Sequence, residues 1–190
     1  MNRSNANGQA TVLETARLRL RRFSLDDAPF ILELVNDPGW LRFIGDRGVR
    51  NLDDARNYIV KGPIDMYTRL GYGLYLVEVK DGKVPAGMCG LLRRDYLDAP
   101  DIGFAFLPAY VGKGLAHEAA VAMMGYARSV LHMPRVLAIT NRENEPSIRL
   151  LGKLGFSLER MVVPEGESRE ICLFATAPRE GTRTTENGHA

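Results

Sequence analysis

Hydrophobic and polar residues follow two different spacings along this chain. Residues 17–23, RLRLRRF, alternate between polar and apolar positions, which predicts a half-exposed β-strand. Residues 24–37 and 114–131 instead repeat apolar residues every three or four positions, which predicts helices with one buried face. The longer helix carries its apolar stripe on Leu115, Ala119, Met123, Tyr126, Ala127 and Val130.

Turn and capping residues divide the rest of the chain into further elements. Ser24, Asn51 or Asp53, and Asn144 are predicted helix N-caps. The Pro-Gly pair at 38–39 is predicted to break the chain after the first helix. Further helices are expected at 51–62 and 144–156, and strands at 72–79, 85–94, 100–110, 135–140, 156–163 and 168–176.

The order of these elements predicts a mixed α/β domain around one twisted sheet. It lacks the regular alternation of strand and helix that a doubly wound dinucleotide-binding fold requires. With 190 residues and 45% hydrophobic content, the chain has the composition of one globular domain. We assign this domain to residues 15–177 and expect the polar, turn-rich ends at 1–14 and 178–190 to be flexible tails.

Composition argues against several classes of function. A net charge of +2 with dispersed arginines gives no basis for nucleic-acid binding. Cys89 and Cys172 stand far apart in apolar runs, which predicts buried free thiols rather than a disulfide. His117, His132 and His189 lack the spacing of metal ligands. We see no signal peptide and no apolar stretch near the ~20 residues of a membrane span, so we expect a cytoplasmic protein.

The sequence Gly112-Lys113-Gly114, at the start of the long predicted helix, is suited to binding a phosphate. A Walker A loop requires Ser or Thr after the lysine, and a GxGxxG fingerprint requires glycine where His117 stands, so neither motif fits. A third interpretation uses the free N–H groups and positive dipole at the helix start, which glycines let a phosphate approach closely. A plain helix-entry loop is equally consistent with these residues alone.

Four short motifs follow one another along the chain. They are TARLRLR at 15–21, DIGF at 101–104, VGKGLAHEA at 111–119, and NEPS at 144–147 followed by KLGF at 153–156. Together they resemble the GNAT superfamily of acetyl-CoA-dependent N-acetyltransferases. The resemblance is greatest to the branch that includes the ribosomal-protein N-terminal acetyltransferases, and it spans residues 15 to 176.

The resemblance implies a fold and a set of residues that bind acetyl-CoA. The implied fold is a twisted mixed sheet of six to seven strands with helices on both faces and a splay between the fourth and fifth strands. Backbone groups are implied to hold the pyrophosphate and the pantetheine arm, and Val111 replaces the tryptophan typical of the branch. The implied residues are Phe104, Ala105, Phe106, Val111, Gly112, Lys113, Gly114, Leu115, Ala116, Asn144 and Ser147.

Acetyl transfer to an amine requires removal of a proton from the amine and protonation of the departing thiolate. Asp101 takes the glutamate position of the E-I-G-Y motif and is our candidate base, with a cap at a strand entrance as the alternative. The resemblance implies that Ser147 contacts the coenzyme sulfur, with helix capping as the alternative. We interpret Glu118 as structural support and His117 as a surface or phosphate-proximal residue. Leu151 departs from the pattern, because many members carry a tyrosine acid there.

The motifs say less about the amine that accepts the acetyl group than about the acetyl-CoA that donates it. We expect an N-acetyltransferase acting on a peptide or protein N-terminus, with a small amine such as a polyamine, amino sugar or antibiotic as the alternative. Because Leu151 replaces the tyrosine, a domain that binds coenzyme A without catalysis and acts as a sensor is a second hypothesis. A nucleotide-binding regulator is a third. A homodimer is implied by the resemblance only. Trp40, Phe43, Tyr72 and Arg93 are candidate acceptor-lining residues, although core packing also explains the aromatic ones.

Overall fold

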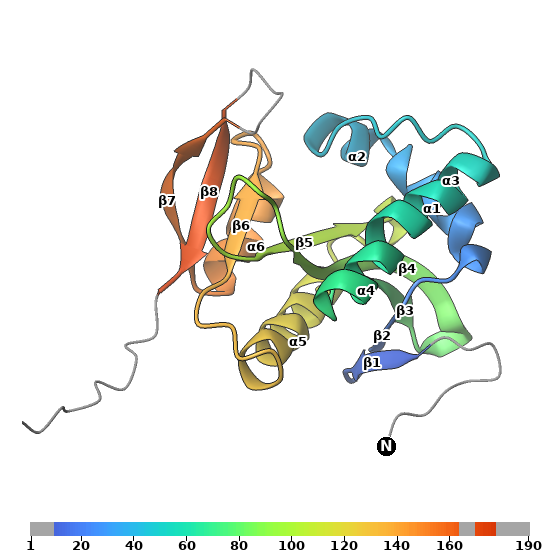
Figure 1. The fold of residues 1–190 in the computed structure, drawn as a ribbon, viewed down its shortest axis with the longest axis horizontal. Helices are drawn as coiled ribbons and strands as arrows, with labels where there is room; N and C mark the ends of the chain where they lie inside the picture. The colour runs from blue at the N-terminus through green and yellow to red at the C-terminus, as the bar shows by residue number, and fades with distance from the viewer. Residues whose placement is uncertain (1–9, 164–169, 178–190) are drawn as a thin grey trace, which may run out of the picture.

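The computed structural model describes residues 10–163 and 170–177, which fold around one mixed sheet of eight strands (Figure 1). The strands follow the order β1-β2-β3-β4-β5-β6-β8-β7 across the sheet. Neighbouring strands are antiparallel except β5 and β6, which are parallel. Their bounds are β1 Thr11–Glu14, β2 Leu18–Arg21, β3 Leu74–Val79, β4 Val84–Leu92, β5 Asp101–Phe106, β6 Leu137–Thr140, β7 Phe156–Val162 and β8 Ile171–Thr176.

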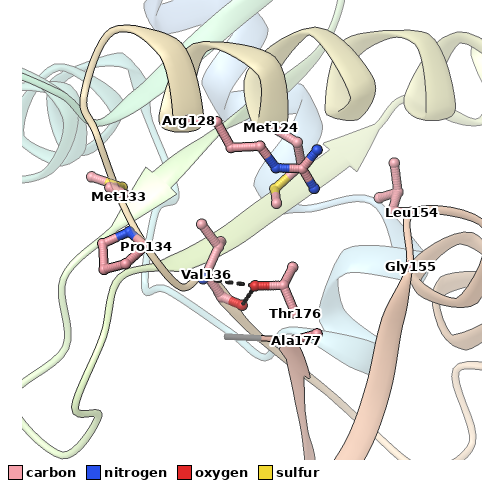
Figure 2. Close-up of a pocket in the computed structure, with 9 residues that line it drawn as sticks. All are labelled: Met124, Arg128, Met133, Pro134, Val136, Leu154, Gly155, Thr176 and Ala177. Carbon is pink, nitrogen blue, oxygen red and sulfur yellow. Dashed lines mark hydrogen bonds between the residues drawn. The ribbon is translucent and has the colours of Figure 1, made fainter. Parts of the chain in front are cut away.

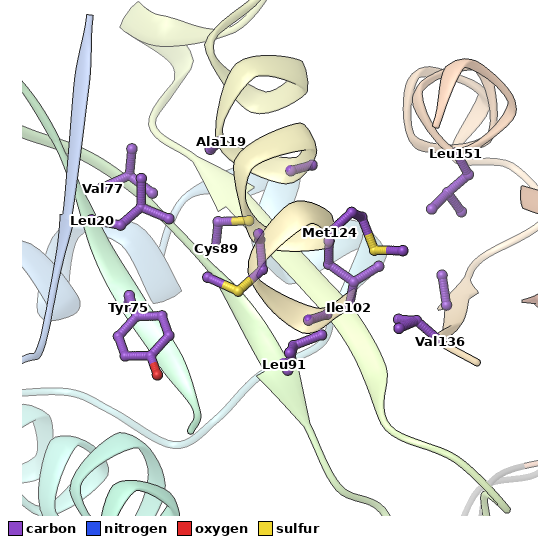
Figure 3. Packing of buried hydrophobic residues seen from close by; sticks show 14 of the residues in the cluster. Leu20, Tyr75, Val77, Cys89, Leu91, Ile102, Ala119, Met124, Val136 and Leu151 are labelled. Carbon is purple, nitrogen blue, oxygen red and sulfur yellow. The ribbon is translucent and has the colours of Figure 1, made fainter. Parts of the chain in front are cut away.

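Helices cover both faces of the sheet. Successive residues of β3 point into two cores, because Leu74 and Leu76 pack with α1 and α3 whereas Tyr75 and Val77 pack with α5 (Figure 3). Leu151 places α6 against the same core as α5. The helices are α1 Ala28–Val35, α2 Pro38–Phe43, α3 Leu52–Ile59, α4 Asp65–Leu70, α5 Leu115–Ser129 and α6 Glu145–Lys153, with a π-helical segment, Val60–Ile64, between α3 and α4.

The predicted mixed α/β architecture is confirmed, and the structure corrects it at the N-terminal end. The sheet has eight strands rather than six to seven. The predicted flexible tail at 1–14 is wrong for its last four residues, because Thr11–Glu14 form β1 and pair with β2. Val12 and Leu13 pack against the main core, which gives this short segment a reason to be ordered. The predicted tail at 178–190 lies outside the described residues.

The first helix ends before the Pro-Gly pair at 38–39, as predicted, and the pair itself begins a second helix. Pro38 takes the first helical position of α2, where its missing N–H costs no hydrogen bond. The Asp37 carboxylate caps the helix by accepting from the Gly39 N–H at 2.8 Å. The predicted caps Asn51 and Asn144 are confirmed, because each side chain accepts a main-chain N–H of its helix.

The sheet divides where β5 meets β6. The two strands share one pair, Asp101 with Leu137, next to a hydrogen bond from the Leu137 N–H to the Pro100 carbonyl at 2.8 Å. Beyond this pair they diverge, and within the described chain no strand pairs with β5 on this side (Figure 1). The implied splay is therefore confirmed, although β1 makes these strands the fifth and sixth.

The two cysteines are buried free thiols, as predicted. Cys89 lies in the core beneath α5 (Figure 3), where burial raises the pKa of its thiol to about 12. Such a thiol stays protonated and unreactive at neutral pH. Among the described residues no helix is long and apolar enough to cross a bilayer. Nor do three or more His, Cys, Asp or Glu side chains gather there in an arrangement that would hold a metal ion.

Candidate functional site

The glycine turn before α5 has a backbone that only glycine adopts readily. Gly112 and Gly114 have φ angles of +78° and +76°, in the left-handed region. Gly114 is the N-cap of α5, and its carbonyl accepts from the Glu118 N–H at 3.1 Å. The N–H groups of residues 115–117, between Gly114 and Glu118, therefore have no partner inside the helix. An added Cβ at Gly112 would meet no atom within 4 Å, so the turn is open to a bound group. These are the features of an anion site.

Lys113 makes two contacts beside the glycine turn, one through its side-chain ammonium and one through its main-chain carbonyl. Its ammonium lies 5.6 Å from the centroid of the Tyr110 ring, within the range of a cation–π contact. Its carbonyl accepts a hydrogen bond from Arg17 Nη1 at 3.0 Å. A positive charge and a fixed main chain therefore occur together beside the open N–H groups.

Glu118 joins the first turn of α5 to the segment between β1 and β2. Its carboxylate accepts from Thr15 Oγ1 at 2.6 Å, from the Arg17 N–H at 2.9 Å and from Arg17 Nε at 2.6 Å. Burial acts to raise the pKa of Glu118, but these hydrogen bonds outweigh it and hold the pKa below its usual value. The geometry supports a structural role for Glu118, and partly buried His117 lines a hollow next to it.

Asp101 lies at the closed end of the splay, as the first residue of β5. It pairs with Leu92 of β4 on one side and Leu137 of β6 on the other, and it is only 1% exposed. Both carboxylate oxygens accept from Arg94 Nε, at 3.1 and 3.0 Å. Burial raises the pKa of Asp101, and the nearby Arg94 guanidinium opposes this effect. Asp101 is thus a buried carboxylate whose cation partner is Arg94.

Two buried or partly buried tyrosines lie in the electrostatic field of this ion pair. Burial raises the pKa of Tyr58, against the field of Arg47 and Arg94. Burial also raises the pKa of Tyr72, and its hydroxyl lies in the fields of Arg93 and Asp101.

The start of α6 supplies the other predicted site residues. Asn144 caps the helix, and its Oδ1 accepts from the Ser147 N–H at 3.3 Å. Ser147 is partly buried, and its hydroxyl makes no hydrogen bond to a residue that the structure describes. One turn later, Leu151 is 1% exposed and packs in the main core.

The predicted coenzyme-binding residues lie on three elements near the open end of the splay. Phe104 and Phe106 of β5 pack into the core under α5, and Ala105 packs on the opposite face. Their main chain forms the unpaired edge of β5, and the exposed Val111 side chain leaves the glycine turn unobstructed.

Among the predicted acceptor-lining residues, Trp40 belongs to the core. It is 6% exposed, packs with α1 and α3, and donates from Nε1 to the Gly45 carbonyl at 3.1 Å. Phe43 is partly buried beneath the Arg42 guanidinium. Burial raises the pKa of Tyr72, on which Arg93 and Asp101 act with opposite signs.

A separate cavity of about 210 Å³ lies at the C-terminal end of α5, away from the glycine turn (Figure 2). Met124 and Arg128 hang from α5 above Val136 and Thr176, and the Thr176 hydroxyl bonds both the N–H and the carbonyl of Val136. None of the predicted site residues lines it.

Arg94 is not among the residues predicted for the site, and Arg17 was predicted only as part of a strand. Arg94 is two residues past Leu92, which pairs with Asp101, so a predicted β4–β5 pairing register would have placed it near that carboxylate. Arg17 lies in the TARLRLR motif, but its partner Glu118 is 101 residues away, and strand alternation carries no signal for such a contact.

Comparison with known families gives a match over most of the chain. Residues 17–157 match the family described as "Acetyltransferase (GNAT) domain". The matched segment contains β2 through α6, and with them the glycine turn, Asp101 and Asn144.

Individual proteins are similar over nearly their full length. The uncharacterized N-acetyltransferase p20 of Bacillus licheniformis is 27% identical, with 88% of this chain and 97% of that protein covered. The spermidine N(1)-acetyltransferase of Escherichia coli K12 is 27% identical, with 83% and 86% covered. The structure of the ribosomal-protein-S5-alanine acetyltransferase of Vibrio fischeri has a TM-score of 0.73 at 17% identity, with 88% and 97% covered, and shows the same fold.

Proposed function

Because this chain belongs to the GNAT family of N-acetyltransferases, we propose that it transfers an acetyl group from acetyl-CoA to the N-terminal amine of a peptide or protein. The observation that carries the proposal is the meeting of two features at the open end of the splay. The glycine turn offers unpaired N–H groups at the start of α5, and the adjacent β5 has an unpaired main-chain edge. A molecule with a phosphate group and an amide-containing arm fits both.

The residues at this end of the sheet fit coenzyme A. The N–H groups of residues 112–116 suit the pyrophosphate, and the Lys113 ammonium adds a positive charge beside them. The backbone of 104–106 suits the amide groups of pantetheine, which would pair with β5 as another strand does. Asn144 and Ser147 lie at the start of α6, across the splay from β5.

Acetyl-CoA supplies an activated acetyl thioester, and residues of this chain accept and donate the protons that the reaction moves. The acceptor nitrogen bonds to the acetyl carbon as the carbon–sulfur bond breaks. Because Asp101 is 1% exposed, the proton released by the nitrogen reaches its carboxylate through a water molecule. The sulfur takes up a proton, and we assign the contact with it to the Ser147 hydroxyl, because Leu151 has no proton to give.

A second candidate function follows from the buried Leu151. Without a tyrosine acid at this position, the domain would act as a coenzyme A sensor if no other group protonates the thiolate. This alternative predicts tight binding of acetyl-CoA and no release of free thiol.

Release of free coenzyme A in the presence of an amine tests the proposed function. We expect thiol release, followed with a thiol reagent, when acetyl-CoA is mixed with an N-terminally unblocked peptide, and none when the same peptide is N-acetylated. Ser147→Ala is expected to lower kcat by roughly tenfold, within the range for loss of one proton donor or water-orienting group. Binding of acetyl-CoA, measured by calorimetry, with no release for any peptide, polyamine or aminoglycoside would favour the sensor.

Arg17→Gln is expected to weaken binding of coenzyme A about tenfold, equivalent to about 1.4 kcal/mol. The change removes the donor that holds the Lys113 carbonyl, and it leaves the Glu118 carboxylate without its cation partner next to the pyrophosphate. Titration calorimetry measures the dissociation constant. Arg56→Gln is the matched control, because Arg56 pairs with exposed Asp53 on α3. Equal affinity in the Arg17 variant and the control would show that the turn needs no support from Arg17.

A further inference from the structure

Strand β7 forms an exposed edge of the sheet. It is the last strand in the order across the sheet, and in the described chain no strand pairs with its outer side (Figure 1). Of its seven residues only Phe156 is buried. The opposite edge differs, because β1 has four residues and packs Val12 and Leu13 on the main core. The free N–H and C=O groups of β7 are therefore available to another strand.

Large apolar side chains gather along this edge. Leu158 is 57% exposed and Met161 is 36% exposed, and Val163, directly after the strand, is 52% exposed. These three residues lie within six positions of one another in the sequence. Exposed apolar side chains concentrated on a free strand edge are typical of an interface with another chain.

A β-bulge puts Leu158 and Met161 on the same face of the sheet. Leu158 pairs with Phe174 and Met161 pairs with Cys172, two residues away on β8. The register shifts between these pairs, and Glu159 is the extra residue. In a regular strand, residues three apart point to opposite faces, so only the bulge lets Leu158 and Met161 share one.

We propose that β7 pairs antiparallel with β7 of a second copy of this chain, about a twofold axis between Glu159 and Arg160. In this register Leu158 of each copy lies opposite Met161 of the other, and Glu159 lies opposite Arg160. Residues directly opposite one another must share a face, and the bulge meets this condition. A twofold interface uses the same surface on both copies, so one self-complementary strand is sufficient.

The charges favour this register over its neighbours. Arg160 is 57% exposed, and Glu159 is held in place by an ion pair with Arg135. Each copy brings one charge of each sign to the axis, so the pairing makes two attractive pairs. Shifting the strands by two residues in either direction would instead set Glu159 opposite Leu158 or Val162. A second copy therefore matches this edge in both apolar character and charge.

Sedimentation equilibrium of the full chain tests the pairing. We expect the average mass to rise from that of one chain toward that of two as the protein concentration increases from about 1 to 200 µM, because one strand edge is a small interface. Leu158→Asp should weaken the dimer at least tenfold, since it places a charge opposite an apolar side chain. Arg160→Glu should weaken it about threefold to tenfold, since it places like charges opposite one another.

Leu52→Asp is the matched control for these variants. Leu52 is 40% exposed and is the first residue of α3, where an acidic side chain suits the helix dipole. The control should form dimers at the same concentration as wild type.

A disulfide tests the register itself. Ser157 and Val162 lie opposite one another across the proposed axis, and they pair with Ala175 and Ile171 of β8, away from Cys172. The double variant Ser157→Cys/Val162→Cys should form a disulfide-linked dimer under mild oxidation. Either single variant should not, because identical residues of the two copies lie about 15 Å apart in this register.

A mass of one chain at every concentration would overturn the proposal. A dimer that Leu158→Asp leaves intact, or that the paired cysteines do not link, would place the interface elsewhere and overturn it as well. These outcomes are independent of thiol release from acetyl-CoA, because β7 contributes no residue to the proposed coenzyme A and acetyl-transfer site.

Discussion

Asp101→Asn is expected to lower kcat/KM about 10²- to 10³-fold, the range for loss of a general base. The amide keeps the size of the side chain but cannot accept the proton that the acceptor amine loses. Binding of acetyl-CoA should change little, because Asp101 lies at the closed end of the splay and the glycine turn at the open end. Steady-state kinetics with an unblocked peptide and calorimetry with acetyl-CoA measure the two effects separately.

Asp98→Asn is the matched control for this variant. Asp98 lies in the same β4–β5 loop, and its side chain is 64% exposed and paired with Arg135. A surface ion pair of this kind contributes little, so turnover within about twofold of wild type is expected. If Asp101→Asn turned over as fast as Asp98→Asn, Asp101 would not be the base.

The same assignment makes a prediction about pH. Burial raises the pKa of Asp101 and Arg94 lowers it, with burial the larger effect. The base is active only when ionised, so kcat/KM should fall as pH drops through a value above the ordinary aspartate pKa of about 3.9. Arg94→Gln removes the lowering effect, so the acid limb should move to higher pH. A limb that stays in place or moves to lower pH would contradict the role given to Arg94.

Gly90→Ala is expected to destabilise the domain by about 3 kcal/mol or more, and to lower the unfolding temperature by roughly 6–12 °C. An added Cβ at Gly90 would lie 2.1 Å from the Gly73 carbonyl oxygen and 2.7 Å from Leu74 Cα. Both are main-chain atoms of the neighbouring segment, and the Gly73 oxygen accepts from the Leu91 N–H at 3.1 Å. The methyl group can be placed only if β3 and β4 separate.

Gly125→Ala should have the opposite effect. Gly125 lies in the interior of α5, is exposed, and an added Cβ would meet no atom within 4 Å. Alanine is favoured over glycine in an exposed helix by about 0.5–1 kcal/mol, so the variant should be more stable than wild type. Urea denaturation measures both variants. If Gly90→Ala and Gly125→Ala were equally stable, close packing would not be the reason that residue 90 is glycine.

Local features of the structure were readable from the sequence because neighbouring residues determine them. The alternation in RLRLRRF gave β2, and the apolar stripe in 114–131 gave α5 within two residues at each end. Asn51 and Asn144 cap helices because their side chains reach N–H groups two or three residues ahead. The glycine turn needed glycine because its φ angles are positive.

The same local signals failed where tertiary contacts decide the outcome. The alternation in β2 predicted exposed arginines, yet Arg21 is 6% exposed and pairs with Asp27 at 2.8 Å and Glu78 at 3.3 Å. Thr11–Glu14 was too short to be distinguished from a tail, and it forms β1 because it pairs with β2 and packs Val12 and Leu13 on the core. Likewise, Pro38 started a helix because Asp37 was positioned to cap it.

The sequence alone determined which kind of protein this is, since four motifs in order carry the main-chain turn, the helix caps and the strand that begins with Asp101. Only the tertiary structure decided what these residues do together. It buried Asp101 against Arg94 and tied Glu118 to Arg17 across 101 residues. The physical reason is range: backbone conformation depends on adjacent residues, whereas charge, burial and pKa depend on groups that only the folded sheet brings within a few ångströms.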